Sequence, residues 1–401
     1  MSRPVLGITG MGIASPIGIG KGNVSRALFS GTRGLIPRDD LIPGHTVYVG
    51  EVAGPLPPVP PALKSLECRN GRLMLAAVAE IAEAAEQVAH QFGRDRVAVV
   101  MGTSTSGIAE GEAAYRTVWQ DGAWSADFHY RQQEIGNLGE FVARVLGLTG
   151  PAYTVATACS SSGKVFASAR RLMLAGLADA AIVGGADTLC RMTVGGFAAL
   201  EAMSGGLCNP FSRNRDGINI GEAAAVFLLT PEPAPVLIVG VGESSDAYHI
   251  SAPDPEGRGA LMAMRSALDD AGLAPADIVY INLHGTGTAL NDSMEGKAVH
   301  ALFGAAIPCS STKSMTGHTL GAAAACEAAF LWLTLHPEYN PDGRLPPHVW
   351  DGEVDSSIPP LTLANVSTRL PNSRGRVAML SNSFAFGGSN VALVLARGDT
   401  G

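Results

Sequence analysis

Short apolar runs alternate with longer stretches of helical spacing along most of the chain. Arg96–Val100, Tyr153–Ala156 and Ala180–Gly184 are apolar runs as long as buried strands, whereas Leu73–Phe92 has helical spacing. Further strands are expected at Ala223–Leu229, Ile278–Leu283, Val377–Ser383 and Asn390–Leu395. This alternation predicts an α/β body in which helices pack on largely parallel or mixed sheets.

The second half of the chain repeats the rhythm of the first. Val236–Gly242 echoes Val5–Gly12, and the proline-rich segment Pro231–Pro235 interrupts the pattern just before the echo. We therefore expect an internal duplication, with an N-terminal half over residues 1–235 and a C-terminal half over residues 236–401.

Two N-terminal segments are rich in turn-forming residues. Val5–Ile8 is strand-like and leads into Gly10–Gly18, which predicts a connection from a strand to a helix. Ser15 stands where a dinucleotide-binding turn has its third glycine, and this disfavours a nucleotide site. Five prolines in Glu51–Pro61 predict an extended surface loop.

One cysteine and two histidines stand out as candidates for chemistry. Cys159 and His284 each follow a predicted strand, and His318 lies five residues after Lys313. Ligands usually bind at strand ends of open α/β sheets. A buried cysteine alone is more often a small apolar residue, but the combination of a thiol, two imidazoles and a lysine favours a catalytic site.

The residues after Cys159 predict a buried helix. Apolar side chains recur there at three- and four-residue spacing, while Arg170 and Arg171 fall on the other side. At the start of such a helix, free N–H groups and the helix dipole stabilise a thiolate and an oxyanion. Acyl transfer through a thioester is the natural reaction, and two neutral imidazoles suit the enolate formed when a malonyl group loses carbon dioxide.

The residues around these three each have a plainer interpretation. Lys313 orders His318 with Glu327 balancing its charge, or the two form an ordinary ion pair. The hydroxyls of Thr286 and Thr288 bind a phosphopantetheine arm in a tunnel, or they cap the next helix, whose first turn suits Asp292 and Glu295. Phe384 and Phe386, beside Gly387 and Gly388, gate an acyl channel or simply pack in the core.

Composition limits the class of protein. The chain has 401 residues, 46% of them hydrophobic, so it can bury a large core, and its net charge of −8 argues against nucleic-acid binding. Six cysteines without paired spacing indicate neither a disulfide scaffold nor a zinc site. We expect a cytoplasmic protein with no metal, because neither a signal peptide nor a membrane span is visible.

The motifs around these residues resemble the β-ketoacyl-acyl-carrier-protein synthases of the thiolase superfamily, in the branch with a Cys-His-His site. The likeness spans nearly the whole chain and includes Gly184–Asp187, Asn209–Ser212, Arg215–Gly217, Ser244–His249 and Asn382–Asn390. It implies a five-layered αβαβα thiolase-like fold built from two duplicated halves with mixed sheets, and a dimer.

The resemblance also implies a mechanism and assigns roles. Cys159 accepts an acyl group from carrier protein, and His284 and His318 assist decarboxylation of malonyl-carrier protein, with Lys313 and Glu327 in support. The N–H groups of Cys159 and Phe386 form the oxyanion hole. Thr286 and Thr288 contact the phosphopantetheine arm that the carrier protein delivers, and no tightly bound cofactor is implied.

Departures from the family pattern concern the substrate. Gly102–Gly107 is polar where housekeeping members place an aliphatic residue near Thr105, and Ala385 replaces a glycine between the two phenylalanines. With Cys68–Asn70 these features look like the ketosynthases of aryl-polyene clusters, which pair with a degenerate chain-length factor, so a heterodimer competes with a homodimer. A housekeeping fatty-acid synthase and a non-catalytic chain-length factor are the alternatives, and retention of all three reactive residues argues against the latter.

Two related enzyme classes and a docking surface complete the analysis. A degradative thiolase needs a second cysteine near the C-terminal glycine turn, and none occurs after Cys326; a Cys-His-Asn synthase has asparagine at the position of His318. Because carrier proteins are acidic, we expect a basic docking patch at the tunnel mouth. Its candidates are Lys64, Arg69, Arg72 and Arg213.

Overall fold

The N-terminal half contributes five strands to a mixed sheet. The computed structural model describes residues 5–371 and 377–398. The strands are β1 (Leu6–Ser15), β5 (Val97–Gly102), β6 (Ala152–Val155), β7 (Ala180–Asp187) and β8 (Ala223–Thr230), with the short β2 (Gly18–Ile19) paired to β1. Their order is β1-β8-β7-β5-β6, antiparallel at the first two contacts and parallel at the last two.

The C-terminal half repeats this order and sense. Its strands are β9 (Val236–Ser245), β10 (Ile278–Asn282), β11 (Pro308–Ser310), β12 (Thr362–Leu363), β13 (Ala378–Phe384) and β14 (Ser389–Arg397). They run β9-β14-β13-β10-β11, again antiparallel twice and then parallel twice, and β12 adds one more parallel strand. A short pairing of β1 with β9 joins the two half-sheets.

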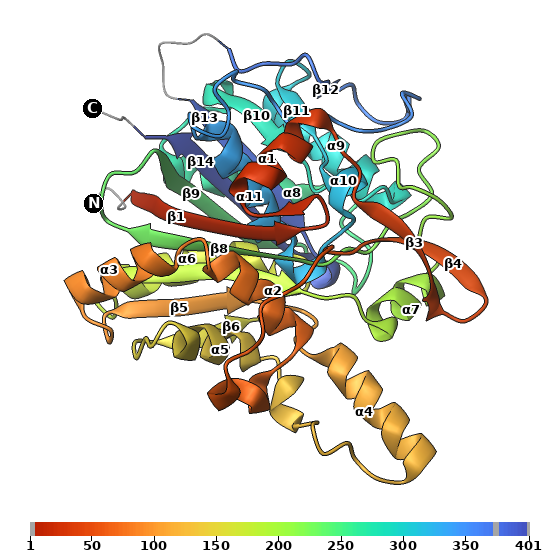
Figure 1. The fold of residues 1–401 in the computed structure, drawn as a ribbon. Helices are drawn as coiled ribbons and strands as arrows, with labels where there is room; N and C mark the ends of the chain where they lie inside the picture. The colour runs from red at the N-terminus through yellow and green to blue at the C-terminus, as the bar shows by residue number, and fades with distance from the viewer. Residues whose placement is uncertain (1–4, 372–376, 399–401) are drawn as a thin grey trace.

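Helices form layers outside and between the half-sheets (Figure 1). One outer face is covered by α2 (Arg69–Val78), α3 (Ala82–Phe92) and α5 (Asn137–Val145). The other outer face is covered by α8 (Arg258–Ala271) and α9 (Ala289–Phe303). Between the half-sheets lie α6 (Ser161–Leu174) and α11 (Ala323–Leu335), with α1 (Lys21–Ser30) beside α11. Every residue of α11 is buried, as expected for a helix that is apolar on all sides. Three apolar clusters fill the spaces between the layers.

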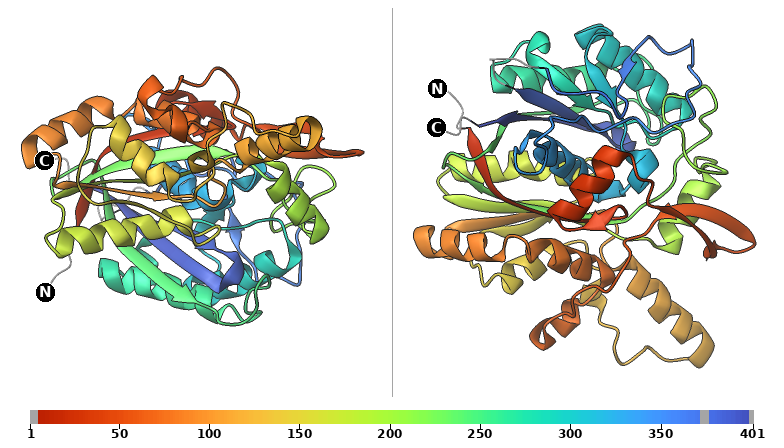
Figure 2. Two further views of the ribbon diagram at one scale, coloured as in Figure 1. Left: turned by 90° about the horizontal axis from the view of Figure 1, so that it is seen from below. Right: turned by 45° about the horizontal axis from the view of Figure 1, so that its top comes forward.

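Several elements lie outside these layers. The hairpin of β3 (Leu35–Ile42) and β4 (His45–Gly50) and the helix α4 (Ile108–Asp121) both project from the layered body (Figures 1 and 2). The remaining helices are α7 (Arg191–Ala199), α10 (Lys313–Thr316) and the 3-10 turns η1 (Pro61–Leu66), η2 (Tyr130–Gln132), η3 (Pro275–Asp277), η4 (Leu320–Ala322) and η5 (Phe386–Gly388).

The structure confirms the predicted fold class, because two half-sheets of the same topology enclose a helical layer and carry helices outside. The echoing segments fall on β1 and β9, which are the equivalent first strands. The predicted division into halves at residues 1–235 and 236–401 falls between β8 and β9. This division stays a prediction, since β1 and β9 pair across it. Residues 1–4, 372–376 and 399–401 lie outside the described part of the chain. Within the described part, no helix is long and apolar enough to cross a bilayer.

The N-terminal glycine segment differs from the prediction, because β1 continues through it to Ser15. The reason is close packing: a Cβ on Gly12 would lie 2.0 Å from the carbonyl oxygen of Ala77 in α2. The predicted helix Leu73–Phe92 is also two helices. Between the two helices, the carboxylate of Glu80 accepts the N–H of Ile13 at 3.1 Å and that of Lys21 at 3.0 Å. The break in the helix therefore brings this carboxylate to backbone N–H groups of the N-terminal segment.

Arg170, which the spacing places opposite the apolar positions of α6, is buried as well. Its guanidinium pairs with Asp270 of α8, and the same carboxylate accepts the N–H of Val241 in β9 at 2.9 Å. The middle layer has no fully solvated side, because a second sheet covers it. Arg170 therefore links the two halves. Of the two arginines, only Arg171 is exposed.

Candidate active site

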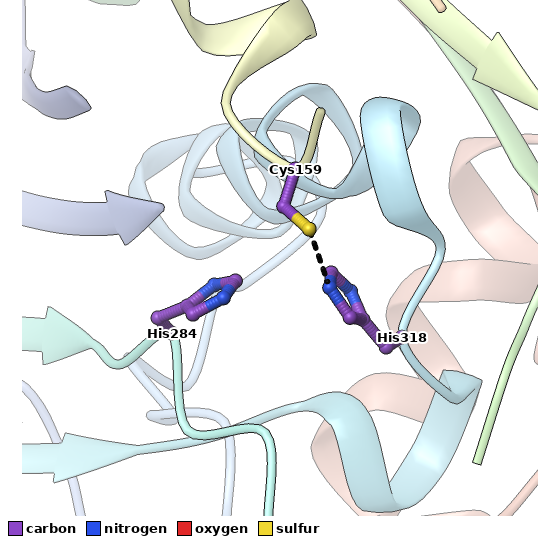
Figure 3. Close-up of side chains that lie close together, drawn as sticks. All are labelled: Cys159, His284 and His318. Atoms are coloured by element: carbon purple, nitrogen blue, oxygen red, sulfur yellow. Dashed lines mark hydrogen bonds between the residues drawn. The ribbon is translucent and has the colours of Figure 1, made fainter. Parts of the chain in front are cut away.

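The side chains of Cys159, His284 and His318 meet in one buried pocket (Figure 3). The sulfur of Cys159 lies 3.0 Å from Nε2 of His318, and one donor atom from each residue lies within 4.8 Å of the others. The two imidazole rings are 5.2 Å apart between centroids and nearly perpendicular, at 85°. The structure thus brings together the three residues that the sequence singled out, with the nucleophile from one half and both imidazoles from the other.

A tight turn presents the sulfur of Cys159. Ala158 has a left-handed φ of 50°, a conformation that costs a residue with a side chain roughly 1–3 kcal/mol. The hydroxyl of Ser161 donates to the carbonyl of Ala158 at 2.6 Å, and that of Ser160 donates to the carbonyl of Thr157 at 2.8 Å. These bonds hold the strained turn between β6 and α6.

The thiol itself is not acidified. Burial raises the pKa of Cys159 to about 12, although the charge of Lys313 and the backbone N–H of Phe386 act in the opposite direction. The expectation that the helix N-terminus favours a thiolate stays a prediction: burial acts against it, and the N–H groups of Ser161 and Gly163 are already bonded within the turn. Attack by Cys159 therefore requires a proton acceptor in contact with the sulfur, and Nε2 of His318 occupies that position.

Both histidines are neutral at neutral pH. Burial, followed by the nearby charge of Lys313, holds the pKa of His284 and of His318 well below 6.5. A neutral imidazole at His318 can accept the proton of the thiol. A neutral imidazole can equally donate a ring N–H to a carbonyl oxygen that becomes negative.

Lys313 and Glu327 form an ion pair beneath the histidines. Both side chains are almost fully buried, at 2% and 4% exposure, and Nζ of Lys313 donates to Oε1 of Glu327. Burial raises the pKa of Glu327 to about 7, while the lysine opposes this rise. Lys313 thus forms an ion pair with Glu327, and its charge also depresses the pKa of both imidazoles. The ion-pair interpretation and the interpretation as an electrostatic influence on His318 therefore hold together.

The loop of His284 is held by residues whose role the sequence analysis missed. Glu295 is fully buried, and its carboxylate accepts the N–H of His284 at 2.8 Å and that of Gly285 at 2.7 Å. Asn382 donates to the same carboxylate at 3.2 Å. Asp292 accepts the N–H of Gly287 at 3.2 Å, so both acids hold the loop. The signal was available: two carboxylates three residues apart share one face of a helix that must pack against the sheet.

The pocket opens to the surface through a cavity of about 370 Å³. Thr286 and Thr288 line it and share a hydrogen bond of 2.9 Å between their hydroxyls, and Thr288 is also the N-cap residue of α9. Phe384 lies inside with its ring 6.0 Å from that of His284. Phe386 is 40% exposed and packs 5.5 Å from Phe197.

Thr105 is the exception among the predicted substrate contacts. Its hydroxyl donates to Asp187 at 2.9 Å and accepts the N–H of Thr188 at 3.0 Å. Thr105 is fully buried and lies outside the lining of the cavity. The polar turn Gly102–Gly107 thus binds an internal carboxylate, and the expectation that Thr105 shapes the acyl pocket stays a prediction.

The predicted docking residues have internal partners. Lys64 pairs with Asp127, Arg213 with Glu353, and Arg69 with the buried Glu222. Arg72 donates to the carbonyl oxygens of Leu56 and Pro57. None of these four basic residues lines the cavity.

A thiol and two imidazoles are also the donor types that zinc prefers. The three donor atoms of Cys159, His284 and His318 are close enough to share one ion. The geometry therefore suits a soft divalent metal as well as covalent chemistry, and the expectation of a metal-free site stays a prediction.

Comparison with known proteins gives the family. The models "Beta-ketoacyl synthase, N-terminal domain" and "Beta-ketoacyl synthase, C-terminal domain" match residues 68–234 and 236–344. The chain is 32% identical over 418 aligned positions to 3-oxoacyl-[acyl-carrier-protein] synthase 2 of Staphylococcus aureus (strain COL), with 97% of each chain covered. The chain therefore belongs to the β-ketoacyl synthase family of condensing acyltransferases.

Two solved structures of ketosynthases are similar to this chain over nearly its whole length. The ketosynthase ApeO in complex with its chain length factor ApeC from Xenorhabdus doucetiae matches with a TM-score of 0.91 and 46% identity, covering 98% of both chains. The ishigamide ketosynthase/chain length factor matches with a TM-score of 0.86 and 28% identity, covering 98% of this chain and 99% of that one. The family and enzyme class predicted from the sequence are confirmed.

Proposed function

We propose that this β-ketoacyl synthase condenses an acyl group held on Cys159 with malonyl-carrier protein. The contact of 3.0 Å between the sulfur of Cys159 and Nε2 of His318, beside the ring of His284, carries the assignment of these residues. In the first half-reaction the sulfur attacks the incoming thioester while its proton moves to His318. The bond between the acyl carbon and the carrier protein's sulfur then breaks, and the leaving thiolate takes the proton from His318. The oxyanion is stabilised by the N–H groups of Cys159 and Phe386, the two backbone groups that act to lower the pKa of the thiol.

In the second half-reaction the malonyl group loses carbon dioxide. The bond between its carboxylate carbon and its α-carbon breaks, and the electron pair forms an enolate whose oxygen accepts N–H bonds from His284 and His318. The α-carbon then attacks the acyl carbonyl, and the bond to the Cys159 sulfur breaks. The product is two carbons longer, and the sulfur leaves as a thiolate that takes a proton from solvent to return to the thiol.

The phosphopantetheine arm of the carrier protein fits the cavity mouth. Thr286 and Thr288 line the passage between the surface and the histidines, and their hydroxyls can bond the polar amides of the arm. No tightly bound cofactor is required in this scheme. A cytoplasmic location stays a prediction.

The acyl chain is, we infer, of the polyunsaturated aryl-polyene type. The likeness to ApeO at 46% identity supports this choice over housekeeping fatty-acid elongation, for which the relative from Staphylococcus aureus is 32% identical. A non-catalytic chain-length-factor role is disfavoured because Cys159, His284 and His318 converge in one pocket.

A heterodimer with a chain-length-factor homologue fits the surface. The edge strand β6 exposes Tyr153, and the projecting α4 region exposes Tyr115, Trp119, Trp124 and Tyr130, with Trp119 at 91%. Exposed apolar side chains in such number mark an interaction surface. Two of the matched structures hold a ketosynthase together with its chain length factor, which favours this partner over a second copy.

Acyl loading tests the substrate assignment. We expect unsaturated aryl-capped acyl groups to transfer from carrier protein to Cys159 at least about 10-fold faster than saturated chains of equal length, a difference of about 1.4 kcal/mol in the transition state. Intact-mass spectra of the chain with its co-expressed chain-length factor, incubated with matched acyl-carrier proteins, measure the transfer. Equal or faster loading of saturated chains would assign the enzyme to fatty-acid elongation.

Carrier-protein docking is expected at an apolar rim, defined as Leu200, Ile250 and Leu290. These side chains are 58%, 79% and 63% exposed. Leu200 and Leu290 line the cavity, and the carbonyl of Ile250 accepts the N–H of Gly387 beside Phe386. The acidic residues Glu201, Asp216 and Asp246 also line the mouth, whereas its single arginine, Arg215, is paired with Asp355.

We expect Ile250→Asp with Leu290→Asp to raise the KM for acyl-carrier protein about 10-fold or more, because charged groups replace apolar contact area. Turnover of a small acyl thioester should not change. Leu174→Asp is the matched control, since Leu174 is 55% exposed at the far end of α6. If Arg213→Glu raises the KM and the rim variant does not, docking is electrostatic and the apolar rim has no part in it.

A further inference from the structure

A carboxylate with no basic partner lies fully buried behind the catalytic cysteine. Asp187, at the end of β7, is 0% exposed. Its Oδ1 accepts the hydroxyl of Thr103 at 2.6 Å, the N–H of Ser104 at 2.7 Å, and the N–H and hydroxyl of Thr105 at 3.0 and 2.9 Å. Its Oδ2 accepts the N–H of Gly321 at 2.6 Å and the hydroxyl of Ser104. Within the described residues, no lysine, arginine or histidine forms an ion pair with it.

These six donors come from two segments that are far apart in sequence. One is the polar turn after β5, and the other is η4, where Gly321 follows His318 by three residues. An isolated buried charge is costly, and hydrogen bonds to an ionised acceptor are about twice as strong as neutral ones. Asp187 therefore ties the two segments together more firmly than a neutral side chain could.

The tied segments press directly on the turn that carries Cys159. A Cβ on Gly102 would lie 2.5 Å from the backbone nitrogen of Ser162, and one on Gly185 would lie 2.6 Å from the Cβ of Ser162. A Cβ on Gly321 would lie 2.7 Å from the nitrogen of Ser104. Backbone thus touches backbone from Asp187 to the first turn of α6.

The loop after His318 needs such a restraint. Leu320 has a left-handed φ of 51°, which is strained for a residue with a side chain. The next N–H, that of Gly321, is the one that Asp187 binds. Releasing this bond removes a restraint on the strained Leu320, whereas the backbone of His318 is also bonded to that of Asn219 and Gly221.

We propose that Asp187 is a positioning residue for the condensation: it clamps the His318–Gly321 loop to the polar turn after β5 and so fixes Nε2 of His318 against the sulfur of Cys159. The proposal rests on the proposed function of these two residues. It also accounts for the polar sequence Gly102–Gly107, whose hydroxyls and amides form the clamp. Asp187 touches no substrate in this arrangement.

The first test is Asp187→Asn. The amide NH₂ must face either the N–H of Gly321 or the N–H groups of Ser104 and Thr105, so at least one part of the clamp opens. A displacement of about 1 Å at a catalytic group costs about 100-fold in rate. We expect kcat to fall between about 10- and 100-fold while the KM for carrier protein stays within about 2-fold, because the cavity mouth is untouched.

The alkylation rate of Cys159 distinguishes a positioning role of Asp187 from a purely structural one. Iodoacetamide needs neither carrier protein nor decarboxylation, so it reports only the pairing of sulfur and imidazole. We expect Asp187→Asn to slow alkylation of Cys159 about 10-fold when His318 is present, and to change it less than about 2-fold in a His318→Ala background. Ser104→Ala removes a hydroxyl that bonds both Asp187 and Gly321, and it provides a milder second variant with the same pattern.

Asp270→Asn is the matched control, because Asp270 is a buried carboxylate that accepts a backbone N–H away from the cavity. It should lower thermal stability without changing alkylation. Equal slowing by Asp187→Asn in both backgrounds, or no slowing by either clamp variant, would overturn the positioning role. If Cys159 of the unmodified protein reacts no faster than Cys309, the proposed function itself fails, and the positioning role fails with it.

Discussion

Replacement of Cys159 by alanine should abolish acyl loading and reduce condensation on the order of 10³-fold or more, because among the described residues no second thiol lines the pocket. Intact-mass spectra after incubation with acyl-carrier protein measure the first effect, and product formation from malonyl-carrier protein measures the second. Decarboxylation of malonyl-carrier protein should persist in this variant, because His284, His318 and the N–H of Phe386 remain in place.

Cys309→Ala is the control for this experiment. Cys309 is a buried thiol in β11 outside the cavity, and its pKa is likewise raised by burial. It should load acyl groups at the normal rate. An acyl adduct on the Cys159→Ala protein, or a normal condensation rate, would remove the cysteine from the mechanism.

The second large effect separates the two imidazoles. His284→Ala should reduce decarboxylation and condensation about 10²- to 10³-fold, as expected for the loss of one donor to a developing oxyanion, while acyl loading of Cys159 continues. His318→Ala should impair both steps, because His318 also contacts the sulfur. Separate rates of acyl transfer and carbon dioxide release measure this difference. Identical losses in both steps for both variants would contradict the division of roles.

The dependence on pH follows from the same contacts. The pKa of His318 lies well below 6.5, so the imidazole stays able to accept the thiol proton down to that lower range, and acyl loading is lost only as pH falls through it. Because the charge of Lys313 contributes to this depression, Lys313→Met should raise the pKa and shift the acid limit of acyl loading toward pH 6.5. Rapid-quench loading measured across pH gives the limit, and no shift would show that burial alone sets it.

The sequence was sufficient for features that depend on neighbouring residues. Strand-like runs before Cys159 and His284 placed both at strand ends, after β6 and β10, which lie in different half-sheets. The duplication was visible because β1 and β9 are built from similar runs of small and branched residues. Lys313 and Glu327 were paired correctly because both belong to segments that follow one another in the chain.

Features that depend on distant contacts were not accessible in this way. The burial of Arg170 was not visible because periodicity cannot show that a second sheet covers the helix. The hydrogen bond of Thr105 was not visible because its partner, Asp187, lies 82 residues away in sequence. Burial of Cys159 by both halves, which raises the pKa of its thiol, was hidden for the same reason.

The repeated topology has a consequence for dissecting this catalyst. The first half supplies the sulfur, the second supplies both nitrogen bases, and the pairing of β1 with β9 joins the two half-sheets. Neither half alone carries the complete set of reacting atoms, so the two halves expressed as separate fragments should both be inert.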